Sequence, residues 1–148
     1  MTLEQEQEIR TLLNMHPKDT KVIRLSNDHP NIAFQMHKMC VFANSYQDLG
    51  FMIPSDSSPE NPPHPFMVFT NSYTTTVDAT KYLHYRLTDI SPRYHNKVVW
   101  FHAGMTDIFK DDMIEKLKMG YLWGIACTEV AGMGLDLSMI RIVVQYGA

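Results

Sequence analysis

From Phe66 onward the chain contains four short runs of apolar residues separated by longer, more polar segments. Each run has the length of a strand and is apolar at nearly every position, which is typical of a strand that is buried on both faces of a sheet. The runs are Phe66–Phe69, Val98–Phe101, Trp123–Cys127 and Ile140–Val144. The pattern therefore predicts four strands in the core of one domain.

Two amphipathic helices are predicted between these strands. Val77–Leu87 carries apolar residues at helical spacing and follows the first run. A second helix is expected after Thr106, whose hydroxyl can cap it, and should end before Gly120. The residues expected on its buried face are Phe109, Met113 and Leu117. Because strands that alternate with single helices favour right-handed crossovers, the expected fold is α/β, with a parallel sheet and helices on both faces.

The N-terminal third has a less regular pattern. Leu3–Met15 has the spacing of a short amphipathic helix, and Lys21–Leu25 and Ile32–Ala43 are predicted as strands. Between these strands, Ser26–Asn31 is rich in turn-forming residues and is expected to be a linker. Met52–Pro65 contains five prolines, a density that no helix or strand interior tolerates, so it is predicted as a surface loop.

The composition is that of an ordinary globular protein, with 45% hydrophobic and 20% charged residues in 148 positions. The sequence has neither an apolar run long enough to span a bilayer nor the basic and apolar start of a secretory signal. A soluble protein of the nucleus or another intracellular compartment is expected, without a membrane partner. Cys40 and Cys127 lie far apart in apolar segments, which favours two buried, reduced thiols over a disulfide or a metal site.

The net charge of −3 does not by itself indicate nucleic-acid binding, but basic residues are concentrated between Lys81 and Lys97. This segment contains four lysine or arginine residues and two histidines against a single aspartate. Two interpretations stay open at this point. The segment is either a patch that contacts phosphates or an ordinary solvated helix end and loop.

Polar residues follow each predicted strand. Because parallel strands end at the same edge of a sheet, these residues are expected to lie together, where ligands of open α/β sheets bind. They are Thr70–Ser72, His102–Gly104, Thr128–Glu129 and Gln145–Tyr146. Hydroxyl, amide and backbone N–H groups suit phosphate oxygens, and the set contains neither paired carboxylates nor a nucleophile with its base. The sequence therefore predicts a phosphate-binding edge, and no catalytic residue or metal ligand is assigned.

Gly132-Met133-Gly134 adds a turn in which the backbone can approach a ligand closely, and Asp136 offers a carboxylate to ribose hydroxyls. Taken alone, two glycines at this spacing are more typical of an ordinary loop. A dinucleotide site would need its glycines directly after the first strand and a third glycine at the start of a helix. These glycines follow the third strand of the regular block, so a dinucleotide site is excluded.

Cys127–Asp136 closely resembles motif V of superfamily 2 helicases, in the form that is typical of the RecQ family. Three other segments are similar to family motifs in order and spacing: Met67–Ser72 to motif IV, Trp100–Met105 to the segment after it, and Ile140–Gly147 to the strand that leads into motif VI. Upstream, Asp28–Ile32 resembles the stretch where RecQ-type chains cross between lobes, although His29 stands where that family usually has arginine. The resemblance covers essentially the whole chain, and motif V is its specific part.

The resemblance implies a role for each matching position. Five residues would contact the phosphodiester backbone of the bound strand, namely Asn71, Ser72, His102, Gly104 and Thr128. Gly134 and Asp136 would face the nucleotide cleft between two lobes. Structural interpretations stand beside these roles: Asn71 and Ser72 can cap a turn, and His102 can close its strand. The carboxylate of Asp136 can hold its own loop through local backbone hydrogen bonds.

Several parts of a complete motor of this family are absent from the sequence. It contains neither the phosphate-binding loop Gly-x-x-x-x-Gly-Lys-Ser/Thr nor an acidic box of the Asp-Glu-x-His type, and the zinc-binding cysteines of many RecQ proteins are missing. It ends at Ala148, before motif VI should supply an arginine that stabilises transition-state charge. Residues 1–31 are expected to form an N-terminal helix, a short strand and the interlobe linker. Residues 32–148 are expected to form a RecA-like C-terminal lobe, truncated before motif VI.

The leading hypothesis is a partial ATP-dependent 3′–5′ DNA helicase, whose second RecA-like lobe contributes contacts with the DNA backbone and the nucleotide cleft. The complete protein would use ATP and Mg²⁺, bind single-stranded or duplex DNA, and pair this lobe with a first one. By itself the chain is expected neither to hydrolyse ATP nor to unwind a duplex. Two alternatives stay open: a catalytically inactive interaction module or truncated gene product, and an RNA helicase lobe, because motif V discriminates DNA from RNA poorly.

Overall fold

The computed structural model describes residues 3–16, 19–21, 23, 30–102, 104–129 and 137–147. The chain divides into two compact units, Met1–His37 and Lys38–Ala148. The first unit contains the helix α1, Leu3–Leu12, in which Arg10 and Glu6 form an ion pair at 2.8 Å. This helix was predicted. The predicted strand at Lys21–Leu25 is wrong for the two of its residues that are described, because neither Lys21 nor Ile23 is in a strand.

The second unit is built around a parallel sheet whose four described strands follow the order β2-β3-β1-β4. The strands are β1 (Phe66–Thr70), β2 (Val98–Phe101), β3 (Gly124–Thr128) and β4 (Ile142–Tyr146). The two central strands are β1 and β3. Every residue of β1 except Phe69 is buried, and so is every residue of β3 except Thr128. The predicted α/β fold with a parallel sheet is therefore confirmed.

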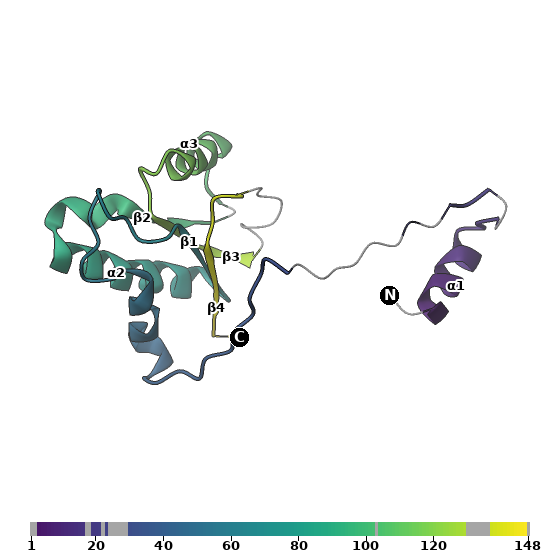
Figure 1. The fold of residues 1–148 in the computed structure, drawn as a ribbon, viewed down its shortest axis with the longest axis horizontal. Coiled ribbons are helices and arrows are strands. Elements are labelled where there is room, and N and C mark those ends of the chain that lie inside the picture. The colour runs from purple at the N-terminus through teal and green to yellow at the C-terminus, as the bar shows by residue number, and fades with distance from the viewer. Residues whose placement is uncertain are drawn as a thin grey trace. The chain divides into compact units, whose positions relative to one another are not determined.

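Two helices cover opposite faces of this sheet (Figure 1). The helix α2, Tyr73–Ile90, begins after a Ser72 cap and is longer at both ends than the predicted Val77–Leu87. The helix α3, Asp107–Lys118, begins as predicted after Thr106, whose hydroxyl accepts the backbone N–H of Phe109 at 3.4 Å. Because the strands are parallel, each connecting helix begins near the carboxyl end of one strand and leads back to the amino end of the next. The starts of α2 and α3 therefore lie near the carboxyl ends of the strands.

The core has one cluster on each face of the sheet. On the α2 side, Phe66 and Val68 of β1 pack with Leu83 and Leu87 of the helix. On the α3 side, buried residues of three strands pack with the helix, namely Met67, Phe101, Ile125, Cys127, Met113 and Leu117. Alternate residues of β1 thus face different helices, as expected for a strand that is covered on both sides.

Two 3-10 helices, η1 (Ala43–Ser45) and η2 (Gln47–Met52), lie beside α2 (Figure 1). The hydroxyl of Tyr82 donates to the carbonyl of Gln47 at 3.4 Å, and the guanidinium of Arg86 donates to the carbonyl of Ile53 at 3.3 Å. Leu49, Met52 and Ile53 are buried in the α2-side core. The proline-rich segment that follows is irregular, as predicted, but these contacts fix its start against α2.

The predicted strand Ile32–Ala43 is wrong. Residues 32–42 carry neither helix nor strand, and Phe34 is 91% exposed. The segment has the alternating apolar pattern of a strand, but among the described residues no strand pairs with it. A strand needs such a partner for its N–H and C=O groups, so the pattern alone did not produce one.

Three smaller predictions also need correction. Phe109 is 38% exposed instead of buried, because it lies in the first turn of α3, beyond the part of the helix that packs on the sheet. Cys40 is exposed, whereas it was predicted to be buried. Cys127 is buried as predicted, and both cysteines are free. The fourth strand spans Ile142–Tyr146 instead of the predicted Ile140–Val144. Gln145 and Tyr146, which were expected to follow the strand, therefore belong to it.

A third 3-10 helix, η3 (Pro92–Lys97), connects α2 to β2. Among the described residues, none of the helices combines the length and apolar character needed to cross a membrane.

Candidate functional site

The carboxyl ends of β1, β3 and β4 lie in register. Thr70 is the backbone partner of Thr128 on one side and of Tyr146 on the other. The next strand, β2, ends one residue earlier, where Phe101 pairs with Cys127. The residues at and just beyond these ends form what we call the carboxyl edge: Thr70, Asn71, Ser72, His102, Gly104, Thr128 and Gly147. The structure thus brings together the strand ends from which the sequence predicted a phosphate-binding edge.

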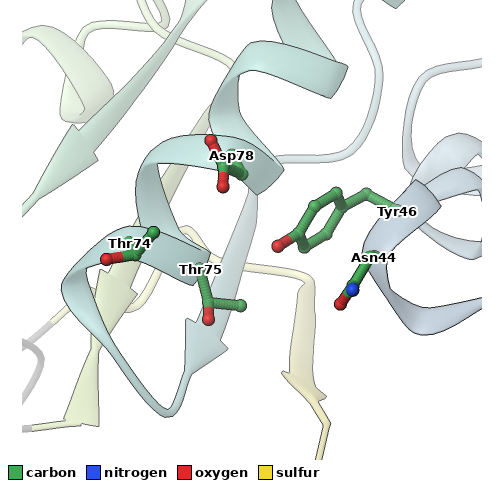
Figure 2. A pocket seen from close by; sticks show the side chains of 5 residues that line it. All are labelled: Asn44, Tyr46, Thr74, Thr75 and Asp78. Carbon is green, nitrogen blue, oxygen red and sulfur yellow. The ribbon is translucent and has the colours of Figure 1, made fainter.

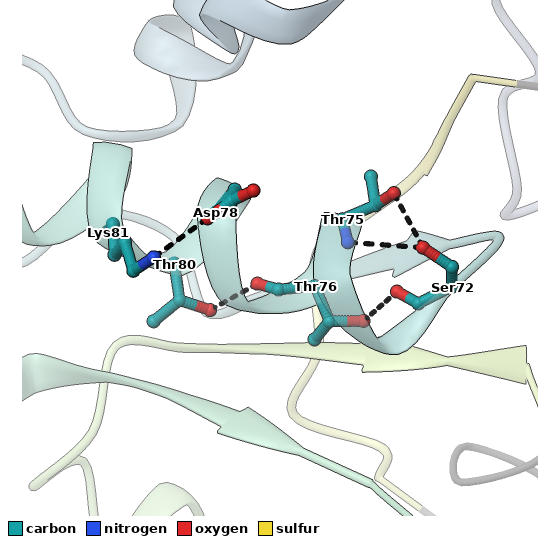
Figure 3. A network of polar contacts seen from close by, with 6 residues as sticks. All are labelled: Ser72, Thr75, Thr76, Asp78, Thr80 and Lys81. Atoms are coloured by element: carbon teal, nitrogen blue, oxygen red, sulfur yellow. Dashed lines mark hydrogen bonds and ion pairs between the residues drawn. The ribbon is translucent and has the colours of Figure 1, made fainter.

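Buried hydroxyls hold the turn between β1 and α2 in place. The hydroxyls of Thr70 and Thr76 are 2.6 Å apart, and Thr76 donates to the carbonyl of Ser72 at 2.9 Å. The hydroxyl of Thr70 also lies 3.2 Å from that carbonyl, so either threonine can be the donor between the two hydroxyls. Both threonine side chains are buried, so this short chain of hydrogen bonds fixes Ser72 relative to the sheet. Figure 3 shows its continuation along α2, where Thr80 donates to the carbonyl of Thr76.

Ser72 caps α2, as one of the two interpretations of the sequence held. Its hydroxyl oxygen accepts the backbone N–H of Thr75 at 3.1 Å and lies 2.8 Å from the hydroxyl of Thr75 (Figure 3). Either hydroxyl can be the donor in the second contact. When Thr75 donates, the proton of Ser72 is free to point outward from the exposed edge. The cap is therefore compatible with a hydrogen bond from Ser72 to a ligand.

Asn71 connects the ends of β1 and β4. Its amide nitrogen donates to the carbonyl of Gly147 at 2.7 Å, and its oxygen accepts a hydrogen bond from the side chain of Gln145 at 3.3 Å. The turn cap considered for Asn71 is not what the structure shows, because its side chain bonds to Gln145 and Gly147 at the end of β4. The side chain is exposed, and its second amide hydrogen has no partner among the described residues.

His102 is held on two sides. Its Nδ1 accepts the backbone N–H of Gly104 at 3.1 Å, which places the proton of the neutral ring on Nε2. Its ring packs edge-on against that of Tyr73, with centroids 4.9 Å apart. A Cβ on Gly104 would lie 3.2 Å from two atoms of the imidazole, so glycine allows the ring to approach the backbone this closely. His102 thus presents an oriented N–H donor.

Thr128 closes β3 and is partly buried. Its hydroxyl makes no hydrogen bond within the described part of the chain. Gly134 and Asp136, the positions expected at the nucleotide cleft, lie outside the described residues, as does most of the segment that resembles motif V. The structure therefore brings Asn71, Ser72 and Thr128 together at adjacent strand ends, and it joins His102 and Gly104 to them through Tyr73.

The carboxyl edge carries little charge. Among residues 3–16, 19–21, 23, 30–102, 104–129 and 137–147, no group of three or more His, Cys, Asp or Glu side chains is placed to hold a metal ion. Burial raises the pKa of the Cys127 thiol to about 12, so this thiol stays protonated and serves as a core residue. The hydrogen-bonding groups described at the edge are the amide of Asn71, the hydroxyl of Ser72 and the imidazole of His102.

The basic segment between Lys81 and Lys97 belongs to α2 and η3, and several of its members are engaged in structural contacts. Lys81 pairs with Asp78 at 2.9 Å, and Lys97 lies 5.5 Å from the ring centroid of Trp123. His84 is 2.7 Å from the carbonyl of Val98, the first residue of β2. That strand end is the one opposite the carboxyl edge. The structure therefore favours the second interpretation of this segment, a helix end and loop.

A polar pocket with a volume of about 470 Å³ lies next to the start of α2. We call it the Tyr46 pocket; its lining residues are Asn44, Tyr46, Thr74, Thr75 and Asp78. Figure 2 shows Asn44 and Tyr46 extending from the segment of η1 toward the first turns of α2. Burial, with a contribution from the Asp78 carboxylate, raises the pKa of Tyr46 above its usual 10.0, so the phenol keeps its proton.

The sequence did not indicate this pocket. Asn44 and Tyr46 come from a segment next to a predicted strand, and no local pattern relates them to Thr74, Thr75 and Asp78. Tyr73 was missed as well, although an aromatic residue next to a polar strand end is a recognisable signal for stacking or ring packing.

Comparison with known proteins gives a family for most of the chain. Residues 48–148 match the family described as the helicase conserved C-terminal domain. ATP-dependent RNA helicase ROK1 of Gibberella zeae is 30% identical over 138 residues, which cover 87% of this chain and 18% of that protein. The proteins of the same name from Kluyveromyces lactis and Saccharomyces cerevisiae are each 38% identical over 45 residues, which cover 30% of this chain and 8% of theirs. The chain thus spans no more than 18% of the length of these relatives.

Proposed function

The chain belongs to the helicase conserved C-terminal domain family, and from this premise we propose that it is part of the second RecA-like lobe of an ATP-dependent RNA helicase. Its fold is the RecA-like α/β fold of that domain. The lobe would act with a first lobe in a complete helicase, whose nucleotide is ATP with Mg²⁺. Gly134 and Asp136 are proposed to face that nucleotide.

RNA is the proposed substrate because the relatives bear the name of RNA helicases. The form of motif V at Cys127–Asp136 resembles the RecQ family and pointed instead to a DNA helicase in repair or recombination. Motif V discriminates the two nucleic acids poorly, whereas the relatives match beyond this motif, over as much as 87% of the chain. RNA therefore replaces DNA as the leading substrate, and single-stranded DNA becomes a comparison in the experiment.

The observation that carries the proposal is the set of neutral donors at the carboxyl edge. Ser72, His102 and Thr128 each present an O–H or N–H at this edge: the Nε2–H of His102 and the hydroxyl of Thr128 have no partner in the described part of the chain, and the proton of Ser72 is free when Thr75 is the donor between their two hydroxyls. Phosphodiester oxygens accept such hydrogen bonds, and contacts of this kind position a strand without reading its bases. The proposed role of the edge is therefore to hold the RNA backbone while the lobe moves with its partner.

The experiment measures the affinity of the chain for fluorescently labelled single-stranded RNA of mixed sequence by anisotropy at low salt. Binding that weakens as salt rises is expected, because each phosphate contact releases counterions. Thr128→Val removes one donor without changing the shape of the side chain, and a net hydrogen bond of about 1 kcal/mol corresponds to roughly fivefold in affinity.

Thr88→Val is the matched control. It makes the same chemical change on α2, where Thr88 donates to the carbonyl of His84 at 2.7 Å. His84 contacts the opposite end of β2, so this variant should bind RNA as the parent does. No measurable affinity for RNA at the lowest salt would contradict the proposal, and tighter binding of single-stranded DNA than of RNA would restore the DNA hypothesis.

A further inference from the structure

The Tyr46 pocket differs in chemistry from the carboxyl edge beside it. Its lining combines the carboxylate of Asp78, the amide of Asn44, the phenol of Tyr46 and the hydroxyls of Thr74 and Thr75. At about 470 Å³ it falls in the size range of ligand sites, roughly 300–1,000 Å³, and is larger than a single nucleobase requires. All of its lining residues belong to the second unit of the chain.

The pocket is physically connected to the edge through Thr75. The hydroxyl of Thr75 lies 2.8 Å from that of Ser72, which is a proposed backbone contact. Thr75 also lines the pocket, together with Thr74 from the same turn of α2 (Figure 2). A strand whose phosphate contacts Ser72 therefore has its neighbouring nucleoside within reach of the pocket.

The charge in the pocket selects which part of a nucleotide can enter. Asp78 places a carboxylate there, and only one of its oxygens is paired, with Lys81 at 2.9 Å. The other oxygen has no partner in the described part of the chain. Because Lys81 offsets the charge of this carboxylate, a phosphate gains nothing from the free oxygen, which cannot donate to it, whereas the exocyclic amino group of a base donates hydrogen bonds to carboxylate oxygens. The pocket thus suits a base rather than a phosphate.

Tyr46 supplies the aromatic surface that such a base needs. Its backbone is left-handed, with φ of 57°, a conformation that costs a bulky residue about 1 kcal/mol or more relative to glycine. The ring is held by Tyr146, with centroids 5.5 Å apart, and Tyr146 in turn donates to the carbonyl of Ala43 at 2.7 Å. Residues in such strained conformations cluster at ligand sites, and unstacked RNA bases commonly stack on aromatic side chains.

We propose that the Tyr46 pocket receives one unstacked base of the bound RNA strand and prefers a base with an exocyclic amino group over uracil. The inference rests on the proposed function, because it requires RNA at the carboxyl edge. It adds base selectivity to contacts that would otherwise be indifferent to sequence. Asp78 accepts the amino group, the ring of Tyr46 packs on the base, and Asn44 and the threonines satisfy its remaining polar atoms.

The test compares the affinities of the chain for oligocytidylate and oligouridylate of equal length, measured by anisotropy at one salt concentration. Cytosine and uracil have the same ring shape but differ at position 4, where cytosine carries the amino group that would donate to Asp78 and uracil carries a carbonyl, and at N3, which is an acceptor in cytosine and a donor in uracil. A hydrogen bond to a charged group contributes about 1.5–3 kcal/mol, so a preference of at least roughly tenfold for oligocytidylate is expected.

Two matched variants distinguish the effect of the Asp78 carboxylate on base preference from the effect of its ion pair with Lys81. Asp78→Asn keeps the size of the side chain and adds a donor for the O4 of uracil, so it should bring the two affinities to within roughly twofold. Lys81→Gln removes the same exposed ion pair but leaves the carboxylate, so it should weaken both complexes equally and keep the preference. Since exposed pairs of this kind contribute little to stability, both variants should fold.

A second measurement locates the contact. Titration of the ¹⁵N-labelled chain with cytidine should shift the amide resonances of Thr74, Thr75 and Asp78, and uridine at equal concentration should shift them less. Equal binding of the two oligonucleotides by the parent chain, or a cytidine preference that survives Asp78→Asn, would overturn the pocket inference and leave the proposed function standing. Failure to bind either oligonucleotide or mixed RNA would overturn both.

Discussion

The imidazole of His102 packs edge-on against the ring of Tyr73, with an angle of 83° between the two planes. His102 follows β2, whereas Tyr73 is the first residue of α2 and follows β1. Because β3 lies between these two strands in the sheet, the contact connects two strand ends that are not neighbours. Together with the hydrogen bond from Gly104, it fixes the ring so that the Nε2–H is available to a ligand at the edge.

Tyr73→Ala is expected to weaken RNA binding by releasing His102. Aromatic pairs of this kind contribute about 0.5–1.5 kcal/mol, which corresponds to roughly twofold to tenfold in affinity. Thermal stability should change little, because Tyr73 is 55% exposed. A double-mutant cycle with His102→Ala checks the mechanism. If Tyr73 acts through His102, its removal has no further effect in the His102→Ala background, and additive losses would instead indicate a direct contact of Tyr73 with RNA.

Gly104→Ala should displace the His102 ring with little cost to folding. The added Cβ would lie 3.2 Å from Nδ1 and Cε1 of the imidazole, a distance that forces the ring to shift, while Gly104 itself is exposed. The ring must give by a few tenths of an ångström, so we expect an RNA affinity that is lower by up to about fivefold, the value for complete loss of a hydrogen bond of about 1 kcal/mol. Ile108→Ala, at an 85% exposed position in the same connection, serves as a control. Equal affinities of the parent and Gly104→Ala would exclude an oriented His102 donor.

The position of the site was predictable from the sequence because it follows from topology. Phe66–Phe69, Val98–Phe101 and Trp123–Cys127 are apolar at nearly every position, and parallel strands necessarily bring the residues after them to one edge. The start of β4 was misplaced because Ile140 is apolar and packs with the α3-side core without belonging to the strand. Side-chain periodicity reports burial, whereas strand bounds depend on backbone pairing.

The hydrogen-bond partners at the site were not predictable in the same way. Asn71 bonds to Gly147 and to Gln145, which lie 76 and 74 positions away, and nothing in the local sequence selects these partners over a turn. The Tyr46 pocket combines an irregular segment with the start of α2, so its residues share no spacing. Contacts of this kind are decided by packing between elements, which a single sequence does not report.

Thr76→Val should destabilise the domain without changing its shape. The hydroxyl of Thr76 is fully buried and forms hydrogen bonds with the carbonyl of Ser72 and with the hydroxyl of Thr70. Its loss leaves the buried hydroxyl of Thr70 without this partner, at a cost of about 1–3 kcal/mol. Urea unfolding monitored by circular dichroism measures this cost. The exposed Thr88→Val should cost less than half as much, and equal effects of the two variants would show that the Thr70–Thr76 contact is unimportant.

Gly124→Ala is expected to be more damaging than Thr76→Val. Gly124 is the first residue of β3 and pairs with both Phe66 and Val98 across the sheet. A Cβ at this position would overlap the ring of Phe66, which is fully buried between β1 and α2. Overpacking of a core typically costs about 1–3 kcal/mol, and the rigid surroundings place this variant at the upper end of that range. The double variant Gly124→Ala/Phe66→Leu should recover part of the loss in the same unfolding assay.

Stability should fall as the pH drops below the ordinary pKa of histidine, because of His84. Burial lowers the pKa of His84 from 6.5, and the neighbouring His95 ring adds to this effect, against the hydrogen bond to the carbonyl of Val98. The unfolded chain therefore binds a proton at a pH where the folded chain does not, so the free energy of unfolding rises with pH in this window. The contribution is complete above pH 6.5 and is lost as the pH falls from 6.5 toward the lowered pKa. In His84→Gln, whose amide can donate to the same carbonyl, unfolding free energies measured across this window should depend less on pH. An unchanged slope would show that the dependence comes from other groups.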